Sequence, residues 1–232
     1  MDNIQVYWLE QCEADMPANN DWLGPDEIVR LNGFHIGKRR ADWRLGRWTA
    51  KRAIASYLGW PADLTDLASI EVHPAWSGAP EASIPHASVA PTISISHRSG
   101  TALCAVSIAG VDLGCDLETI EPRDEAFVRD YFTAEEQQVI EKAPLVERNR
   151  TVALLWSAKE SVLKALHEGL RLDPRAVFVT YGDDPPDAGE WTQLTGRCGD
   201  YPIFQGWWSQ TGQTLRTMVV HPPSRSPARL QT

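Results

Sequence analysis

The stretch Trp156-Ser157-Ala158-Lys159-Glu160-Ser161-Val162-Leu163-Lys164 decides the fold, because an earlier stretch of the chain repeats it. The earlier copy is Trp48-Thr49-Ala50-Lys51-Arg52-Ala53-Ile54, with Trp and Ala-Lys at the same relative positions. The two copies start about half a chain apart in a protein of 232 residues. This spacing predicts an internal duplication. Arg52 stands where Glu160 stands, so one copy is basic at this position and the other is acidic.

We therefore expect an α+β fold made of two similar α/β halves, 1–109 and 110–221, related by a pseudo-two-fold axis. The segment 222–232 has no apolar period and is expected to be a disordered tail. The expected strands lie at 4–9, 92–97, 102–108, 111–118, 177–181 and 217–220. The expected helices cover 21–59, with breaks at Gly33 and Gly37, a segment that starts with a capping box at Thr133 and Glu136, and 148–167. A tight hairpin is expected at Ala109-Gly110, and 61–91 is expected to be loop.

Composition narrows the class of protein. Hydrophobic residues make up 43% and charged residues 23%, as in ordinary soluble domains. The net charge of −9 argues against non-specific nucleic-acid binding. We expect no signal peptide and no membrane span, since no basic segment precedes a long apolar run. The four cysteines form no C-x-x-C pair, which favours reduced thiols and a cytoplasmic location.

A basic stretch crosses the first copy of the repeat. Seven cations fall within fifteen residues of this acidic chain: Lys38, Arg39, Arg40, Arg44, Arg47, Lys51 and Arg52. Two explanations stay open: a solvated helix face, or a site for an anion.

Three acids and an amine form the clearest candidate site. Asp116 and Glu118 are two apart on an expected strand, so their carboxylates share one face, where they suit a hard ion such as Mg²⁺. Glu160 offers a third acid, and Lys164 lies one helical turn beyond it. The ordinary alternatives are solvated strand-end acids and a surface ion pair. Trp156, one turn before Glu160, favours a covered face.

Ser96 and His97 end an expected strand and could donate hydrogen bonds to a phosphate. The sequence holds no nucleophile elbow, phosphate-binding P-loop, dinucleotide glycine motif or zinc spacing. Acids for a metal, cations for phosphates and a candidate base suit phosphoryl-type transfer, in which the substrate brings the attacking hydroxyl.

Three motifs in this order resemble the 4′-phosphopantetheinyl transferases. They are Ser94-Ile95-Ser96-His97, Gly114-Cys115-Asp116-Leu117-Glu118, and the Trp156–Lys164 stretch followed by Gly169-Leu170. Length and internal repeat are similar to the surfactin-type subgroup, in which two related halves form a pseudo-dimer in one chain. The resemblance implies a monomer with its active site in the cleft between the halves.

The resemblance also implies roles for residues. Asp116, Glu118 and Glu160 would hold Mg²⁺ against the pyrophosphate of coenzyme A, and Glu160 would be the base for a serine hydroxyl. The residues expected to contact coenzyme A are Ser96, His97, Lys164 and, near the 3′-phosphoadenosine end, Arg47 and its basic neighbours. Two departures stand out: Ala79 replaces the usual lysine of a Gly-Lys-Pro segment, and Cys115 replaces a branched aliphatic residue.

The implied reaction transfers 4′-phosphopantetheine from coenzyme A to a serine of an acyl or peptidyl carrier protein, releasing adenosine 3′,5′-bisphosphate. The alternative is a protein that binds coenzyme A or a carrier without transferring the group. Carrier proteins of this kind are generally acidic, and we expect docking on 119–132 through exposed apolar side chains and the cations Arg123 and Arg129. The sequence leaves open which carrier is modified and whether acyl-coenzyme A is accepted.

Overall fold

The computed structural model describes residues 4–61, 63–85, 87, 89–182 and 187–231. The helices are α1 (Pro25–Asn32), α2 (Gly37–Leu58), α3 (Leu64–Ser69), α4 (Glu125–Tyr131), α5 (Ala134–Lys142) and α6 (Leu145–Ala165). The strands of the first part are β1 (Ile4–Cys12), β2 (Glu71–Pro74), β3 (Pro80–Ser83), β4 (Thr92–Arg98) and β5 (Thr101–Ser107). Those of the second are β6 (Asp112–Thr119), β7 (Val177–Tyr181), β8 (Thr192–Cys198), β9 (Phe204–Thr211), β10 (Thr214–His221) and β11 (Ser224–Arg229).

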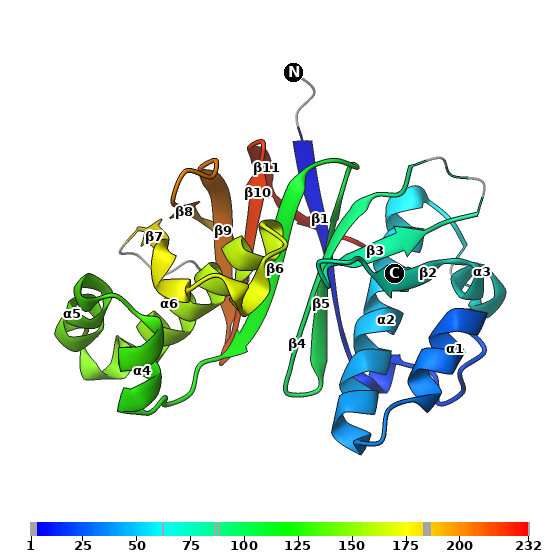
Figure 1. Ribbon diagram of the computed structural model, residues 1–232, viewed down its shortest axis with the longest axis horizontal. Helices are drawn as coiled ribbons and strands as arrows, with labels where there is room; N and C mark the ends of the chain where they lie inside the picture. Colours follow the sequence, from blue (N-terminus) through cyan, green and yellow to red (C-terminus); the bar gives the residue numbers. More distant parts are fainter. Residues whose placement is uncertain (1–3, 62, 86, 88, 183–186, 232) are drawn as a thin grey trace.

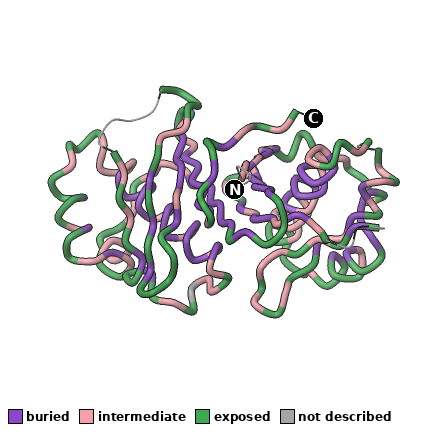
Figure 2. The backbone as a smooth tube through the Cα atoms, turned by 90° about the horizontal axis from the view of Figure 1, so that it is seen from above, coloured by how far each residue is buried: buried purple, intermediate pink, exposed green. Residues whose placement is uncertain are grey.

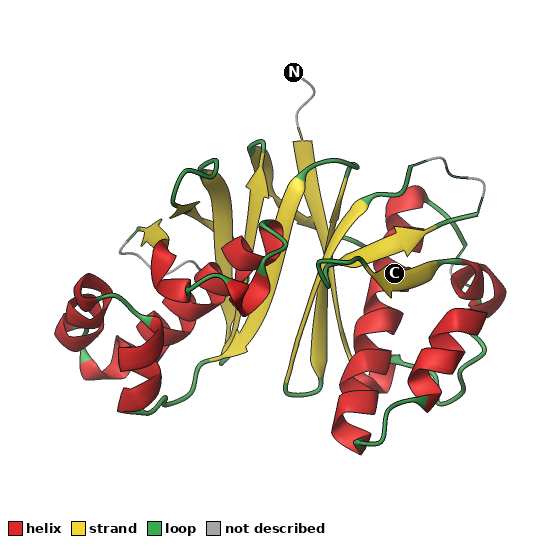
Figure 3. Cartoon of the chain, viewed as in Figure 1, coloured by secondary structure: helices red, strands yellow, loops and turns green. Residues whose placement is uncertain are grey.

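The molecule is a mixed α/β protein of two units that stand side by side, each with a long helix against its own sheet (Figure 1). The first sheet has the order β11-β1-β5-β4, and the second has the order β6-β10-β9-β8-β7. When β11 is left out, both sheets follow the same pattern. The first strand of the unit (β1 or β6) lies beside the last strand (β5 or β10), which lies beside the strand that precedes it in the chain (β4 or β9). In each unit a short helix, α1 or α5, precedes the long one, α2 or α6 (Figure 3). This repeated order confirms the prediction of two similar halves.

Among the groups of buried side chains in the described part of the chain, three hold the helices and sheets together. One lies between α2 and the first sheet, another between α6 and the second sheet. The third joins the sheets to each other and contains Val6, Leu103, Leu113 and Met218, one from each of β1, β5, β6 and β10. Figure 2 shows buried backbone inside both units and where they meet. No helix in the described part of the chain is long and apolar enough to span a membrane.

Three expectations from the sequence were wrong. The strands around Ala109-Gly110 form no hairpin, because β1 and β4 occupy both edges of β5 and β6 pairs with β10 instead. The segment 61–91 is not only loop: Asp63 caps α3, and β2 and β3 pair with each other. The tail is not disordered, since β11 pairs in parallel with the free edge of β1. Backbone pairing of this kind needs no apolar period. The boundary between 109 and 110 stays a prediction and falls in the loop between β5 and β6.

A buried lysine on each long helix repeats the same contacts in both units. Lys51 of α2 is fully buried and donates hydrogen bonds to the carbonyl oxygens of Trp22 (2.9 Å) and Leu67 (3.1 Å). Its third partner is the carboxylate of Glu27, which closes the first turn of α1 by accepting from the Gly24 amide.

Lys159 of α6 matches this arrangement. It is fully buried and donates to the carbonyl oxygens of Pro174 (2.9 Å) and Val177 (2.7 Å) and to Glu136 Oε2 (2.9 Å). Glu136 belongs to the capping box with Thr133 that the sequence predicts. The shared Ala-Lys of the internal repeat therefore encodes a structural anchor between each long helix and its surroundings.

Candidate active site

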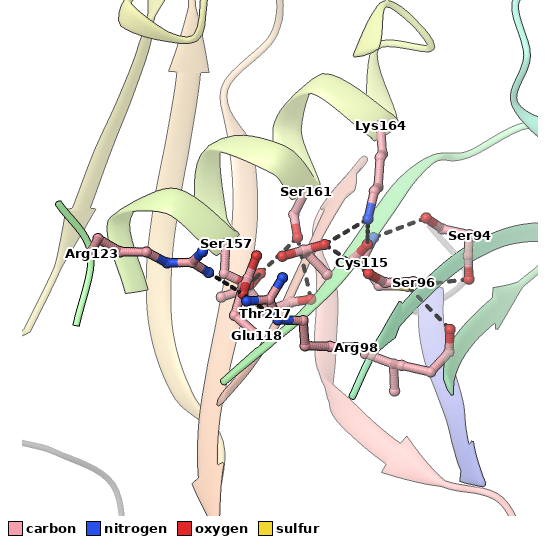
Figure 4. A network of polar contacts seen from close by, with 12 residues as sticks. Ser94, Ser96, Arg98, Cys115, Glu118, Arg123, Ser157, Ser161, Lys164 and Thr217 are labelled. Atoms are coloured by element: carbon pink, nitrogen blue, oxygen red, sulfur yellow. Dashed lines mark hydrogen bonds and ion pairs between the residues drawn. The ribbon is translucent and has the colours of Figure 1, made fainter. Parts of the chain in front are cut away.

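The candidate site lies where α6 and β6 of the second unit meet β4 of the first. Helix α6 sits directly on β6 because Gly114 has no side chain: a Cβ atom there would lie 1.8 Å from the Ser161 carbonyl oxygen. This close approach brings Glu160 and Lys164 over Asp116 and Glu118, which share the face of β6 that carries Gly114. Figure 4 shows the resulting network of polar contacts.

Asp116 is buried and makes charge-assisted hydrogen bonds through one oxygen. Its Oδ1 accepts from Lys164 Nζ (2.7 Å) and from Ser96 Oγ (2.8 Å). Its Oδ2 is buried and has no hydrogen-bond partner among the described residues. Burial disfavours the charged form of Lys164, but the charge and hydrogen bond of Asp116, together with the charges of Cys115 and Glu160, outweigh this effect and raise the pKa of Lys164. The amine is therefore a fixed positive charge.

Side chains of β4 cover the outer edge of β6. The amide of Cys115 donates to Ser94 Oγ (3.0 Å), and the carbonyl oxygen of Cys115 accepts from Lys164 Nζ (3.0 Å). A strand edge must satisfy its backbone groups, and here hydroxyl and amine side chains do so. The contacts from Ser94 and Ser96 fix the first unit against the acids of the second.

Glu118 is buried and lies between two arginines. Its Oε2 accepts from Arg123 (2.9 Å) and lies 3.4 Å from Arg98 Nε. Both arginines also contact Glu121, at the surface end of the network. Burial and the nearby charge of Asp116 raise the pKa of Glu118, against the lowering effect of the two guanidinium groups.

Glu160 is partly buried on the face of α6 that covers β6. Burial raises its pKa; Lys164 opposes this, and the charges of Asp116 and Glu118 add to it. Burial is the larger cause of the raised pKa of Glu118 and of Glu160, and repulsion between the carboxylates adds to it. Trp156 covers this helix face as expected, since its ring lies 5.1 Å from Phe127, centroid to centroid.

The three carboxylates lie in one cluster, but they are not grouped as a metal site. Within the described residues, no set of three His, Cys, Asp or Glu side chains is arranged to hold an ion. Internal cations account for this arrangement, because Lys164 pairs with Asp116 and the arginines pair with Glu118. The donor chemistry nevertheless fits Mg²⁺: all three are oxygen ligands, and Asp116 Oδ2 has no partner within the described chain.

His97 and Arg47 line a cavity of about 400 Å³ beside the acid cluster, between α2 and β4. The guanidinium of Arg47 lies 5.0 Å from the centre of the Trp43 ring, and burial lowers the pKa of Arg47 to about 10. His97 reaches solvent, but partial desolvation by the cavity wall lowers its pKa, against the opposing charge of Asp42. This cavity joins cations to an aromatic surface, as an anionic ligand with a planar ring requires.

The cations of the basic stretch fall on different faces of α2 and have different surroundings. Lys38, Arg39 and Arg47 line the cavity with His97, so the anion-site explanation fits them. Arg44 instead donates to the carbonyl oxygens of residues 17–19, and Lys51 is buried with Glu27. A second cavity, of about 250 Å³, is lined by Ala79 and Lys164, among others, so the departure at Ala79 lies beside the candidate site.

The segment 119–132 carries both core and groove residues. Phe132 is buried, and Phe127, Val128 and Tyr131 pack partly against the same core. Arg123 and Arg129 line a groove of about 560 Å³ between α4, α5 and α6.

Sequence reasoning missed Ser94 as a backbone partner and Arg98 and Glu121 as members of the network. In the sequence, Ser94 stands out only as the first residue of the Ser94-Ile95-Ser96-His97 motif, and Arg98 and Glu121 belong to no motif. Their roles depend on β4 lying against β6, a contact between residues about twenty positions apart that no local motif reveals.

The chain is similar to known proteins in sequence and, over part of its length, in structure. Residues 112–203 match the family model described as the 4′-phosphopantetheinyl transferase superfamily. The chain is 25% identical, over 164 residues, to the 4′-phosphopantetheinyl transferase HetI of Nostoc sp. (strain PCC 7120), which covers 70% of this chain and 67% of the relative. A solved structure, the holo-[acyl-carrier-protein] synthase of Thermotoga maritima, aligns with a TM-score of 0.35 and 19% identity, over 56% of this chain and 76% of that one.

The family match covers the part of the chain that carries Asp116, Glu118, Glu160 and Lys164. The related sequence and the arrangement of these side chains lead to the same enzyme class. Over residues 112–203 the chain is similar to the 4′-phosphopantetheinyl transferase superfamily.

Proposed function

We propose that this enzyme transfers the 4′-phosphopantetheine group of coenzyme A to a serine hydroxyl of an acyl or peptidyl carrier protein, with Mg²⁺, and releases adenosine 3′,5′-bisphosphate. The observation that carries the proposal is the position of the acid cluster. Asp116, Glu118 and Glu160 lie between a cationic, aromatic-lined cavity and a groove that contains arginines. Coenzyme A and a carrier protein can approach the acids from these two sides.

Coenzyme A would bind along β4 and α2. Its phosphates suit Lys164, Ser96 and His97, and its 3′-phosphoadenosine end suits the cavity with Arg47. An incoming phosphate favours the protonated form of His97, since an opposite charge favours the charged form of a group. Which of Lys38, Arg39 and Arg47 contacts the ligand is a matter for mutation.

Glu160 would take the proton of the acceptor serine, directly or through a water molecule. Its raised pKa makes it a better proton acceptor than an ordinary carboxylate. The serine oxygen then forms a bond to the phosphorus next to pantetheine, and the bond from that phosphorus to the bridging oxygen breaks. The bridging oxygen leaves on adenosine 3′,5′-bisphosphate, with Lys164 as a nearby positive charge.

Asp116, Glu118 and Glu160 are the residues that would hold Mg²⁺. When bound, the ion would neutralise the pyrophosphate and the charge that develops on the leaving oxygen.

The two units support a surfactin-type organisation, with the halves 1–109 and 110–221 acting as a pseudo-dimer within a monomer. All four cysteines lie in the described part of the chain and are free thiols, which is compatible with work in the cytoplasm.

Mass spectrometry of an apo carrier protein, incubated with this enzyme, coenzyme A and Mg²⁺, tests the proposal. The carrier should gain the mass of one phosphopantetheine group, and a carrier with alanine at the acceptor serine should gain none. Tight binding of coenzyme A or carrier with no gain in mass would support the alternative, a binding protein without transferase activity.

A further inference from the structure

Arg123 belongs to two places in the molecule at once. One of its guanidinium nitrogens donates to Glu118 Oε2 (2.9 Å), inside the acid cluster. The same side chain lines the groove of about 560 Å³, where its guanidinium lies 5.2 Å from the centre of the Phe127 ring. In Figure 4 Arg123 reaches Glu118 from the side opposite Lys164. This side chain therefore links the groove to the acids.

The pairing engages one oxygen of Glu118. Glu118 Oε2 accepts from Arg123 and also lies 3.4 Å from Arg98 Nε. The positive charge of a guanidinium beside this oxygen repels a divalent cation at the same place. Binding of Mg²⁺ through this oxygen is therefore favoured when at least one guanidinium leaves.

The two arginines differ in what they can reach. Arg98 is held between Glu118 and Glu121, and it is not among the described residues that line the groove. Arg123 lines the groove and has a longer contact with Glu121, 3.5 Å. Arg123 is thus the arginine that a molecule in the groove can draw away.

The groove has the chemistry of a docking surface for acidic, partly apolar side chains. Three arginines line it, against two glutamates, and its apolar residues lie between them. The lining residues that matter here are Arg123, Arg129, Arg148, Val128, Ile140 and Val152. The excess of positive charge contrasts with the net charge of −9 of the whole chain. A carboxylate that enters the groove is therefore attracted locally.

We propose that Arg123 is a positioning residue: it holds Glu118 until a carboxylate of an acidic carrier protein enters the groove and takes over the guanidinium, which frees Glu118 for Mg²⁺. This inference rests on the proposed function and adds a coupling between the docking of the carrier and the binding of Mg²⁺. The exchange is physically reasonable because neither charge is left unpaired: Arg123 changes one carboxylate for another, and Glu118 changes a guanidinium for a metal ion. Carrier and Mg²⁺ must then strengthen each other's binding by the same factor.

Calorimetric titration of Mg²⁺ in the presence of coenzyme A tests the inference without measuring turnover. The proteins are the wild type, Arg123→Ala, Arg123→Lys and Arg129→Ala, each checked for folding by thermal melting. Arg129 is the matched control, because it lines the same groove but pairs with Asp130 and not with Glu118. Each titration is made alone and with a carrier whose acceptor serine is alanine, which binds but cannot be modified.

In the wild type, the carrier should raise the Mg²⁺ affinity by about 5-fold to 100-fold, the usual range for coupled sites. Arg123→Ala should bind Mg²⁺ more tightly than the wild type before any carrier is added, and the carrier should then add less than about twofold. Arg123→Lys should restore part of the coupling, since it keeps the charge but not the planar guanidinium. Arg129→Ala should bind the carrier more weakly, but the bound carrier should still raise its Mg²⁺ affinity as in the wild type.

Unchanged or weaker Mg²⁺ binding in Arg123→Ala overturns the inference. Arg123→Gln replaces this variant if alanine prevents folding. Equal Mg²⁺ affinity of the wild type with and without bound carrier refutes the link to the groove. Transfer to an unaltered carrier is measured separately. If the wild type transfers the group but shows no coupling, only this inference is refuted. If the wild type never transfers the group, the proposed function is refuted, while the titrations without carrier still decide whether Arg123 competes with Mg²⁺.

Discussion

Replacing Lys159 by methionine should destabilise the protein strongly, although the residue lies away from the reacting atoms. Its buried amine donates to the carbonyl oxygens of Pro174 and Val177 and to Glu136. Methionine fills similar space but leaves all three acceptors without their donor. Breaking a buried ion pair by removing one partner costs about 3–5 kcal/mol. For a chain of this size each kcal/mol lowers the melting temperature by about 2–4 °C, so the expected fall is roughly 6–20 °C.

Thermal unfolding followed by circular dichroism measures this fall, with three comparisons. Lys51→Met removes the matching anchor in the first unit and should lower the melting temperature by a similar amount. Lys142→Met, at an exposed position, should shift it by no more than about 2 °C, as for an ordinary surface change. Adding Glu136→Gln to Lys159→Met should recover part of the loss, because no unpaired buried charge remains.

Melting of Lys159→Met within about 2 °C of the wild type would refute the reasoning, because the buried amine would then contribute no more than a surface lysine. A large effect of Lys159→Met with none for Lys51→Met would refute the equivalence of the two anchors.

Three further predictions concern the acid cluster. Glu160→Gln should lower turnover by about a hundredfold or more, the scale of general-base removal, as measured by the gain in carrier mass over time. Because the pKa values of Glu118 and Glu160 are raised above 4.5, the folded state binds more protons than the unfolded state above that pH, and each acid lowers stability as the pH rises. Denaturant unfolding should therefore show Glu160→Gln gaining stability relative to the wild type between pH 4.5 and 7; a constant difference would contradict the raised pKa. Lys164→Ala should mainly weaken coenzyme A binding in calorimetry, and it should also lower the melting temperature, because it leaves Asp116 without its cation. Unchanged coenzyme A affinity would remove Lys164 from the phosphate site.

The acids could be predicted because their pattern is local. Asp116 and Glu118 share a face through strand alternation, and Glu160 and Lys164 share one through the helical period. The capping box at Thr133 is likewise contained in four residues. Patterns that span only a few residues can be recognised in the sequence without any knowledge of the tertiary structure.

The partners of these acids could not be predicted, because they come from distant contacts. Arg98 reaches Glu118 only because β4 lies against the edge of β6. The same limit explains Lys51: its place in a basic stretch left open a solvated helix face or an anion site, but helical period and tertiary packing direct it to Glu27. The missing apolar period predicted a disordered tail, yet the open edge of β1 imposes a strand on 224–229.

The return of β11 to the first sheet has a mechanical consequence. The second unit cannot move away from the first without pulling a strand out of its neighbour's sheet, so the halves are interlocked and not merely in contact (Figure 1). A single cut in the loop between β5 and β6 would leave two fragments that still share this sheet.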